Sequence, residues 1–191
     1  MKVGVLGLQG DVREHLGALE TAGASPMIVK RPEEMQSIDA LVLPGGESTT
    51  IGKLLDRFGL LGPLTERVAR GMPVYGTCAG MILLAARIEG RDEAPHRIAA
   101  LDVTVVRNGY GRQVDSFEAD VDVKGFDSPF RAVFIRAPLV EDAGPGVEVL
   151  SEVDGRPVLV REGRILASSF HPEMTGDARI HEMFLSMLDG G

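Results

Sequence analysis

Residues 73–86, with the sequence PVYGTCAGMILLAA, carry the pattern that decides the fold. The first three residues are apolar and predict a strand, and the apolar run from 79 to 86 predicts a helix. Between them, Gly76-Thr77-Cys78-Ala79-Gly80 has the glycine-x-nucleophile-x-glycine spacing of a turn that lifts its middle side chain above a sheet. The stretch therefore predicts an α/β fold that exposes a thiol at a strand-to-helix turn.

The sequence before this stretch repeats the same alternation of short apolar runs and helical periodicity. Strands are expected at 3–8, 27–29 and 40–43, and helices at 12–19, 49–58 and 62–70. Both β-α-β-β and β-α-β-α-β remain open for residues 2–43. Because the strands are apolar at successive positions, they are expected to form a mostly parallel central sheet with helices on both faces.

The second half of the chain has a different hydrophobic pattern, because polar residues alternate with apolar ones in strand-like segments at 101–107, 113–123 and 132–135. Alternation of this kind favours antiparallel pairing. A meander is expected at 147–153, 157–161 and 164–169, because Asp154-Gly155 and Glu162-Gly163 suit hairpin turns. A last helix is expected at 178–188. No linker interrupts the chain, and we expect a single domain over residues 1–191.

Composition excludes several classes of protein. The 191 residues contain one cysteine, which excludes an internal disulfide framework and multi-cysteine metal sites and fits a reducing compartment. The net charge of −8 would repel a nucleic-acid backbone. No apolar run reaches the roughly 18 residues that a membrane span needs, and the first eight residues do not resemble a signal peptide. A cytoplasmic location is expected, with neither nucleic acid nor membrane as partner.

Cys78 is a candidate nucleophile, because a helix N-terminus beside the sulfur favours the thiolate. A thiol nucleophile needs a base and a group that orients the base. His171-Pro172-Glu173 offers both, since side chains two apart on an extended segment project to the same side. A buried structural cysteine is the alternative. The other histidines, His15, His96 and His181, are expected to be packed or solvated.

Residues 41–50, LVLPGGESTT, predict a strand that ends in paired glycines before a helix. Glycine permits close backbone approach, so the N–H groups of this turn could stabilise a developing oxyanion together with Ala79 N–H. Ser48 is a plausible N-cap of the helix, and a plain capped turn remains open. A P-loop is excluded, because the glycine-lysine-hydroxyl ending is missing.

Three segments, in their order along the chain, resemble the class I, triad-type glutamine amidotransferases. They are Pro44-Gly45-Gly46-Glu47-Ser48, Gly76-Thr77-Cys78-Ala79-Gly80 and His171-Pro172-Glu173. Further segments resemble the glutaminase subunits of pyridoxal 5′-phosphate synthases within that family: residues 7–10 (GLQG), 107–108 (RN), 110–117 (YGRQVDSF) and 135–138 (IRAP). Residues 112–117 are specific to that branch. Asp11 and Gly109 depart mildly from the pattern, which has small or apolar residues there.

The resemblance implies a flavodoxin-like, three-layer fold and hydrolysis of L-glutamine to glutamate and ammonia. It implies Cys78 as nucleophile, His171 as base and acid, and Glu173 as the group that orients His171. It also implies a glutamine site and an oxyanion hole formed by the N–H groups of Gly46 and Ala79. The implied glutamine-binding residues are Gly46, Glu47, Ser48, Arg107, Ile135 and Arg136. Neither metal nor cofactor is expected.

A partner is implied as well: a barrel-shaped synthase subunit that receives ammonia and builds the vitamin B6 cofactor within a large hetero-oligomer. We hypothesise that docking of this partner reorganises the Gly45–Gly46 peptide. Residues 9–22 either lie at the interface with the partner or form a helix with a solvated face, and both interpretations remain open. Three alternatives remain: a class I glutaminase for another synthase, a stand-alone cysteine hydrolase, and a catalytically silent binding module.

Overall fold

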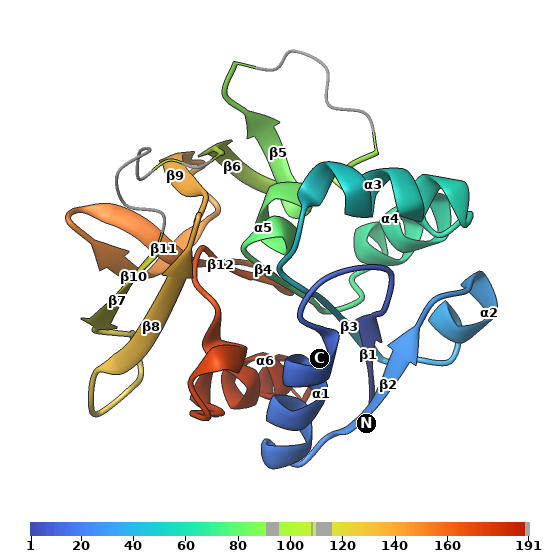
Figure 1. The fold of residues 1–191 in the computed structure, drawn as a ribbon, viewed down its shortest axis with the longest axis horizontal. Coiled ribbons are helices and arrows are strands. Elements are labelled where there is room, and N and C mark those ends of the chain that lie inside the picture. Colours follow the sequence, from blue (N-terminus) through green and yellow to red (C-terminus); the bar gives the residue numbers. More distant parts are fainter. Residues whose placement is uncertain (91–95, 108, 110–115, 190–191) are drawn as a thin grey trace.

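Figure 1 shows the computed structural model of the chain, which describes residues 1–90, 96–107, 109 and 116–189. The strands are β1 (Lys2–Leu6), β2 (Ser25–Val29), β3 (Ala40–Leu43), β4 (Val74–Thr77), β5 (Ala85–Ile88), β6 (Leu101–Val106), β7 (Ser116–Val121), β8 (Phe130–Ile135), β9 (Leu139–Ala143), β10 (Glu148–Val153), β11 (Arg156–Glu162) and β12 (Ile165–Ser168). The helices are α1 (Val12–Thr21), α2 (Pro32–Met35), α3 (Ser48–Arg57), α4 (Leu61–Ala69), α5 (Ala79–Leu84) and α6 (Arg179–Asp189), with a 3-10 turn η1 (Pro172–Met174).

The central sheet has seven strands in the order β10-β11-β12-β4-β3-β1-β2. The five strands from β12 to β2 pair in parallel, as their continuous apolar sequences predict. β10, β11 and β12 pair antiparallel and extend the sheet at one edge, so the predicted meander is confirmed. The first β-α-β unit is followed by the short helix α2 before β3, which selects the β-α-β-α-β order.

Alternating side chains of each strand enter two separate cores, which gives the molecule three layers (Figure 1). Val3 and Val5 of β1 face the core under α1 and α6, whereas Leu6 faces the core under α3, α4 and α5. β3 divides in the same way, with Val42 on the first side and Leu43 on the second. Both faces of β1, β3, β4 and β12 are therefore buried, as the α/β prediction requires, whereas the edge strand β2 leaves Ile28 exposed.

The parallel strands bring four loops to one edge of the sheet, because the carboxyl ends of parallel strands lie together. β1 is followed by the loop with Gln9 and Asp11, and β3 by the Gly45-Gly46 loop. β4 ends at Thr77, directly before Cys78, and β12 runs toward His171. The sheet order thus gathers the predicted glycine-rich loop, the nucleophile and the base at one edge.

Two smaller sheets add the remaining walls around this edge. β7 and β8 pair antiparallel, as predicted, and the end of β8 carries Ile135 to the carboxyl edge. The order β5-β6-β9 forms a second sheet, in which β6 and β9 are antiparallel but β5 and β6 are parallel. Part of the predicted 113–123 strand, residues 113–115, lies outside the described residues.

One predicted boundary was wrong and one strand was missed, both for a tertiary reason. The helix predicted over 79–86 ends at Leu84, and Ala85 begins β5. The carbonyl of Ala85 accepts a hydrogen bond from Arg97 Nη1 (2.7 Å), and β5 pairs with β6, so remote partners override local helical preference. Sequence reasoning did not predict β9, which forms against β6.

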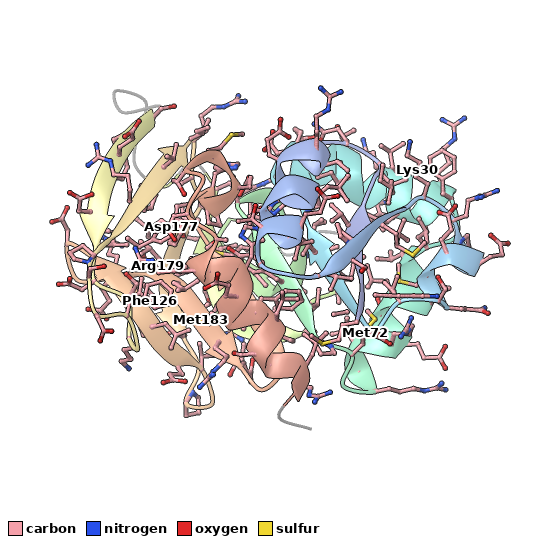
Figure 2. All side chains as sticks on the ribbon, turned by 90° about the horizontal axis from the view of Figure 1, so that it is seen from below. Lys30, Met72, Phe126, Asp177, Arg179 and Met183 are labelled. Atoms are coloured by element: carbon pink, nitrogen blue, oxygen red, sulfur yellow. The ribbon has the colours of Figure 1, made fainter. Side chains whose placement is uncertain are left out.

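The connection from η1 to α6 is held by Arg179. Its guanidinium pairs with Asp177 (2.7 Å) and lies 4.8 Å from the centre of the Phe126 ring, and Figure 2 shows the three side chains together at the start of α6. This anchor fixes the segment that follows His171. None of the helices in the described part of the chain combines the length and the apolar character needed to cross a membrane.

Candidate active site

A cavity of about 640 Å³ opens at the carboxyl edge of the parallel strands. Eight of the residues singled out in the sequence line it: Cys78, His171, Gly46, Glu47, Ser48, Arg107, Ile135 and Arg136. Glu173 lies behind His171, and Ala79 is buried at the first position of α5. The structure thus brings together segments that are far apart in the sequence. Asn108 and residues 110–115, which belong to the family-specific segments, lie outside the described residues.

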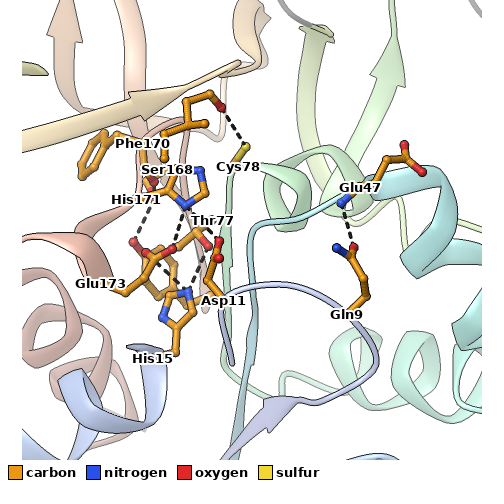
Figure 3. Close-up of polar contacts among 12 residues, drawn as sticks. Gln9, Asp11, His15, Glu47, Thr77, Cys78, Ser168, Phe170, His171 and Glu173 are labelled. Atoms are coloured by element: carbon orange, nitrogen blue, oxygen red, sulfur yellow. Dashed lines mark hydrogen bonds and ion pairs between the residues drawn. The ribbon is translucent and has the colours of Figure 1, made fainter. Parts of the chain in front are cut away.

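Cys78 sits at the turn between β4 and α5 with φ +48° and ψ −100°. This backbone conformation is rare for a residue with a side chain and is typical of strained functional turns. The Cys78 N–H donates to the carbonyl of Ser168 (2.8 Å), which ties the turn to the end of β12. The turn places the thiol in the cavity that His171 also lines, and Figure 3 shows the two side chains beside one another.

The glycines on either side of Cys78 are needed for close packing. Neither Gly76 nor Gly80 has a positive φ. A Cβ atom on Gly76 would lie 2.6 Å from the Gly80 carbonyl carbon, and one on Gly80 would lie 2.2 Å from the Leu43 carbonyl oxygen. Only glycine fits at either position, because α5 packs directly against the backbone of the sheet.

His171 Nδ1 donates to Glu173 Oε1 at 2.7 Å, so the predicted pairing of base and carboxylate is present. Its predicted cause was wrong, because Glu173 belongs to the 3-10 turn η1 and not to an extended segment. His171 itself is extended, at φ −107° and ψ 87°, and its N–H donates to Val133 of β8 (2.8 Å). The turn folds the carboxylate back under the ring.

Asp11 is a site residue that sequence reasoning missed. Its Oδ2 lies 3.4 Å from His171 Nδ1, so a second carboxylate faces the nitrogen that Glu173 occupies. Sequence analysis recorded Asp11 as a departure from the family pattern and placed it within the possible docking segment 9–22, but gave it no role in the active site. The usable signal was its position, because an acid four residues after Gly7, the residue that follows β1, lies in the loop at the carboxyl edge of the sheet.

The electrostatics of the cavity favour a charged imidazole. Burial alone lowers the pKa of His171, but hydrogen bonding of the imidazolium to Asp11, Cys78 and Glu173 outweighs it and raises that pKa well above its ordinary value. Burial raises the pKa of Glu173, against the opposing effect of its hydrogen bond with His171. With Nδ1 engaged by carboxylates, Nε2 is the nitrogen left to exchange a proton with the thiol.

The Gly45-Gly46 loop packs against both the imidazole and the first loop. A Cβ on Gly45 would lie 2.4 Å from His171 Cε1, so glycine is required for close approach. Gly46 has φ +147°, in the region that favours glycine. The Glu47 N–H donates to Gln9 Oε1 (2.8 Å), and a Cβ on Gly10 would collide with the Gly45 carbonyl. The first loop therefore supports the peptide beside the imidazole.

The predicted N-cap of α3 was wrong by one residue. Glu47 caps the helix, because its carboxylate accepts hydrogen bonds from the N–H groups of Thr49 (3.1 Å) and Thr50 (2.7 Å), and Ser48 is the first helical residue. Burial acts to raise the pKa of Glu47, but the hydrogen bonds from Thr50 and Thr49 lower it to about 2. The Glu47 carboxylate thus stays negative at the cavity wall.

Arg107 follows β6 and reaches across the cavity to the start of α3. Its guanidinium donates to the hydroxyls of Ser48 and Thr49 (2.9 Å for Thr49) and lies 3.4 Å from Glu47 Oε1. The Arg107 guanidinium and the Glu47 carboxylate therefore both face the cavity. Such a pair suits a ligand that carries both a carboxylate and an ammonium group.

The end of β8 contributes through its backbone. The Cys78 thiol lies 3.8 Å from the Ile135 carbonyl oxygen, and Arg136 has φ +43°. A positive φ at a residue with a long side chain turns the chain sharply away from β8. The Ile135–Arg136 peptide is thereby presented to the cavity.

Comparison with known proteins gives close similarity over nearly the whole chain. Residues 5–189 match the SNO glutamine amidotransferase family. The pyridoxal 5′-phosphate synthase subunit PdxT of Mycobacteroides abscessus is 58% identical over 191 residues, 99% of this chain and 98% of that protein. The same subunit of Mycolicibacterium vanbaalenii is 57% identical over 192 residues, 98% of this chain and 97% of that protein. A crystal structure of a glutamine amidotransferase superposes with a TM-score of 0.93 at 49% identity, covering 98% of both chains.

Proposed function

The chain belongs to the SNO glutamine amidotransferase family, and we propose that it hydrolyses L-glutamine and passes the ammonia to a synthase subunit that makes pyridoxal 5′-phosphate. The observation that carries this proposal is one cavity that holds Cys78 and His171, with the Glu173 carboxylate 2.7 Å from His171 Nδ1. A thiol, an imidazole and an orienting acid are the groups that acyl transfer from an amide requires.

The reaction starts when the Cys78 sulfur attacks the side-chain amide carbon of glutamine, after its proton has passed to His171 Nε2. A carbon–sulfur bond forms, and the amide oxygen becomes negative. His171 then returns a proton to the nitrogen, the carbon–nitrogen bond breaks and ammonia leaves. Water, deprotonated by His171, attacks the thioester and releases glutamate with the free thiol. Glu173 keeps the ring oriented through both halves.

We assign Gly46, Glu47, Ser48, Arg107, Ile135 and Arg136 to the glutamine site. The Arg107 guanidinium binds the α-carboxylate, because its planar fork can donate two parallel hydrogen bonds. The Glu47 carboxylate, which remains ionised, accepts from the α-ammonium group. The Ile135 carbonyl adds a backbone acceptor near the sulfur.

We assign the oxyanion hole to the N–H groups of Gly46 and Ala79. A backbone donor of this kind contributes about 3–4 kcal/mol to transition-state stabilisation. Docking of the synthase subunit reorganises the Gly45–Gly46 peptide and so completes the hole. Support comes from Gln9 and Gly10, which hold that peptide in place and belong to the loop we place at the interface together with α1. A cytoplasmic location and a large hetero-oligomer belong to the same proposal.

The experiment is ammonia release from L-glutamine by the chain alone and with a saturating amount of its cognate synthase subunit. We expect stimulation by the synthase and no ammonia from the Cys78→Ala variant. A rate that the synthase does not change would contradict the docking step. Stimulation by a different synthase, or no modification of Cys78 by a glutamine-derived affinity label in the complex, would contradict the proposed function.

A further inference from the structure

A buried polar cluster lies behind Glu173, on the side away from His171 (Figure 3). His15 of α1, Thr77 of β4 and His181 of α6 are all fully buried, and none of them lines the cavity. His15 Nδ1 lies 3.0 Å from His181 Nε2, and His15 Nε2 lies 3.1 Å from Thr77 Oγ1. His15 Nε2 also lies 3.5 Å from Glu173 Oε2. The mechanism described above uses none of these three side chains.

Glu173 needs a donor on the oxygen that His171 does not use. Oε1 accepts from His171, whereas Oε2 is buried and has no hydrogen bond within the described part of the chain. Burial disfavours the charged carboxylate, and a protonated Glu173 could no longer stabilise a charged imidazole. His15 Nε2 is a donor 3.5 Å from this oxygen, and in this structure its hydrogen bond is with Thr77 Oγ1 (3.1 Å). Active-site hydrogen bonds that are long without substrate shorten in the reacting complex.

The contacts of the two histidines decide where their protons lie. If His15 carried its proton on Nδ1, His181 would hold its own on Nδ1, a buried nitrogen without a partner, and an unpaired buried donor is unfavourable. The His15 Nε2 lone pair would then also face the Glu173 carboxylate. In the other arrangement His181 Nε2–H donates to His15 Nδ1, and His15 Nε2–H points at Thr77 and Glu173. In this arrangement His181 Nδ1 is an unpaired acceptor instead of an unpaired donor.

We propose that His15 is a positioning residue for the reaction: its Nε2–H, fixed in that tautomer by His181, holds the second oxygen of Glu173 and keeps the carboxylate ionised and aligned with His171. This inference rests on the proposed glutaminase function. It extends the chain of contacts from the thiol into the core between α1 and α6.

The surroundings keep both rings neutral, as the tautomer argument requires. Burial first, and then the neighbouring His181 and His171, lower the pKa of His15 well below its ordinary value. Burial lowers the pKa of His181 to about 4. The remaining polar groups that face His15 are Thr77 and Tyr75 on β4 and Glu173 on η1. If a substitution of His15 changes the pH dependence of the rate, it therefore does so by changing the pKa values of Glu173 and His171.

The test compares three variants in the complex with the synthase subunit. His15→Leu keeps the volume but removes the donor, whereas His15→Gln can place an amide N–H close to the former Nε2 position. Leu19→Ala is the matched control, because Leu19 lies one turn further along α1 and is also fully buried. Thermal unfolding of each variant measures the stability loss, so that catalytic effects are compared at temperatures where all three are folded.

We expect His15→Leu to lower kcat by about 10- to 100-fold, the range typical of outer hydrogen-bond partners, with little change in KM. In the pH dependence of kcat, the acid limb of His15→Leu should move to higher pH by roughly half a unit or more, because loss of the donor raises the pKa of Glu173. His15→Gln should restore most of kcat and the acid limb, and Leu19→Ala should leave both in place. A kcat within twofold of wild type for His15→Leu, no rescue by Gln, or the same loss in Leu19→Ala would overturn the proposal.

A second measurement does not depend on turnover. Long-range ¹H–¹⁵N NMR spectra distinguish the tautomers of neutral histidine, and we expect His15 and His181 to carry their protons on Nε2 near neutral pH. A proton on His15 Nδ1 would refute the inference even if the enzyme is active. Conversely, wild-type complex that releases no ammonia would refute the proposed function, while the tautomers would still test whether His181 donates to His15 Nδ1.

Discussion

Replacing Asp11 with Asn tests the electrostatic description of the cavity most directly. The substitution removes one charge and keeps the shape of the side chain. Asp11 Oδ2 lies 3.4 Å from His171 Nδ1, and the Asp11 side chain is 30% exposed. The carboxylate stabilises the imidazolium, so its loss should lower the pKa of His171.

The magnitude follows from the distance. A unit charge pair at that separation is worth about 5 kcal/mol at an effective dielectric of 20 and about 1 kcal/mol in water. A partly exposed carboxylate falls between these limits, and a retained Glu173 bond at 2.7 Å keeps part of the stabilisation. We therefore expect the pKa of His171 to fall by about 1–2 units, at 1.36 kcal/mol per unit.

The assay is an NMR titration of the His171 Cε1 proton, combined with the pH dependence of Cys78 alkylation. Because a raised pKa stabilises the folded state below the unfolded value, Asp11→Asn should also lose stability near pH 6 and lose less as pH rises through the folded pKa. Glu20→Gln, which removes an exposed acid from α1, the helix that Asp11 precedes, is the control. An unchanged His171 midpoint in Asp11→Asn, or an equal shift in Glu20→Gln, would refute the reasoning.

Three further substitutions test the assigned roles in glutamine hydrolysis by the complex. Cys78→Ala should abolish ammonia release while the circular dichroism spectrum and synthase binding stay intact, and retained turnover would refute the nucleophile. Glu173→Gln should lower kcat by roughly 10²–10⁴-fold with a smaller effect on KM, because an orienting group acts mainly in the transition state; a change confined to KM would assign Glu173 to substrate binding. Arg107→Lys should raise KM for glutamine by about tenfold or more, since a charged bidentate contact contributes roughly 1.5–3 kcal/mol, and an unchanged KM would remove Arg107 from the carboxylate site.

The predictions that failed share one cause. Sequence reasoning placed His171 and Glu173 on an extended segment, and it assigned Ser48 as the N-cap, because both readings are locally reasonable. In the structure the 3-10 turn at Pro172–Met174 brings Glu173 to His171, and Glu47, one residue before Ser48, caps α3. Local preference fixes which groups are available, whereas the packing of adjacent segments selects among conformations of similar energy.

The sequence by itself determined the α/β alternation, the strands that are buried on both faces, and the placement of chemistry-bearing residues just after strand ends. These features depend on near neighbours along the chain, so periodicity and turn residues reveal them. Only the tertiary structure decided which remote groups touch. Asp11 meets His171, and His15 meets His181 across a separation of 166 residues, because the strand order and the packing of α1 and α6 on the same face of the sheet bring these segments together. No local pattern encodes that adjacency, since it arises from how the layers pack.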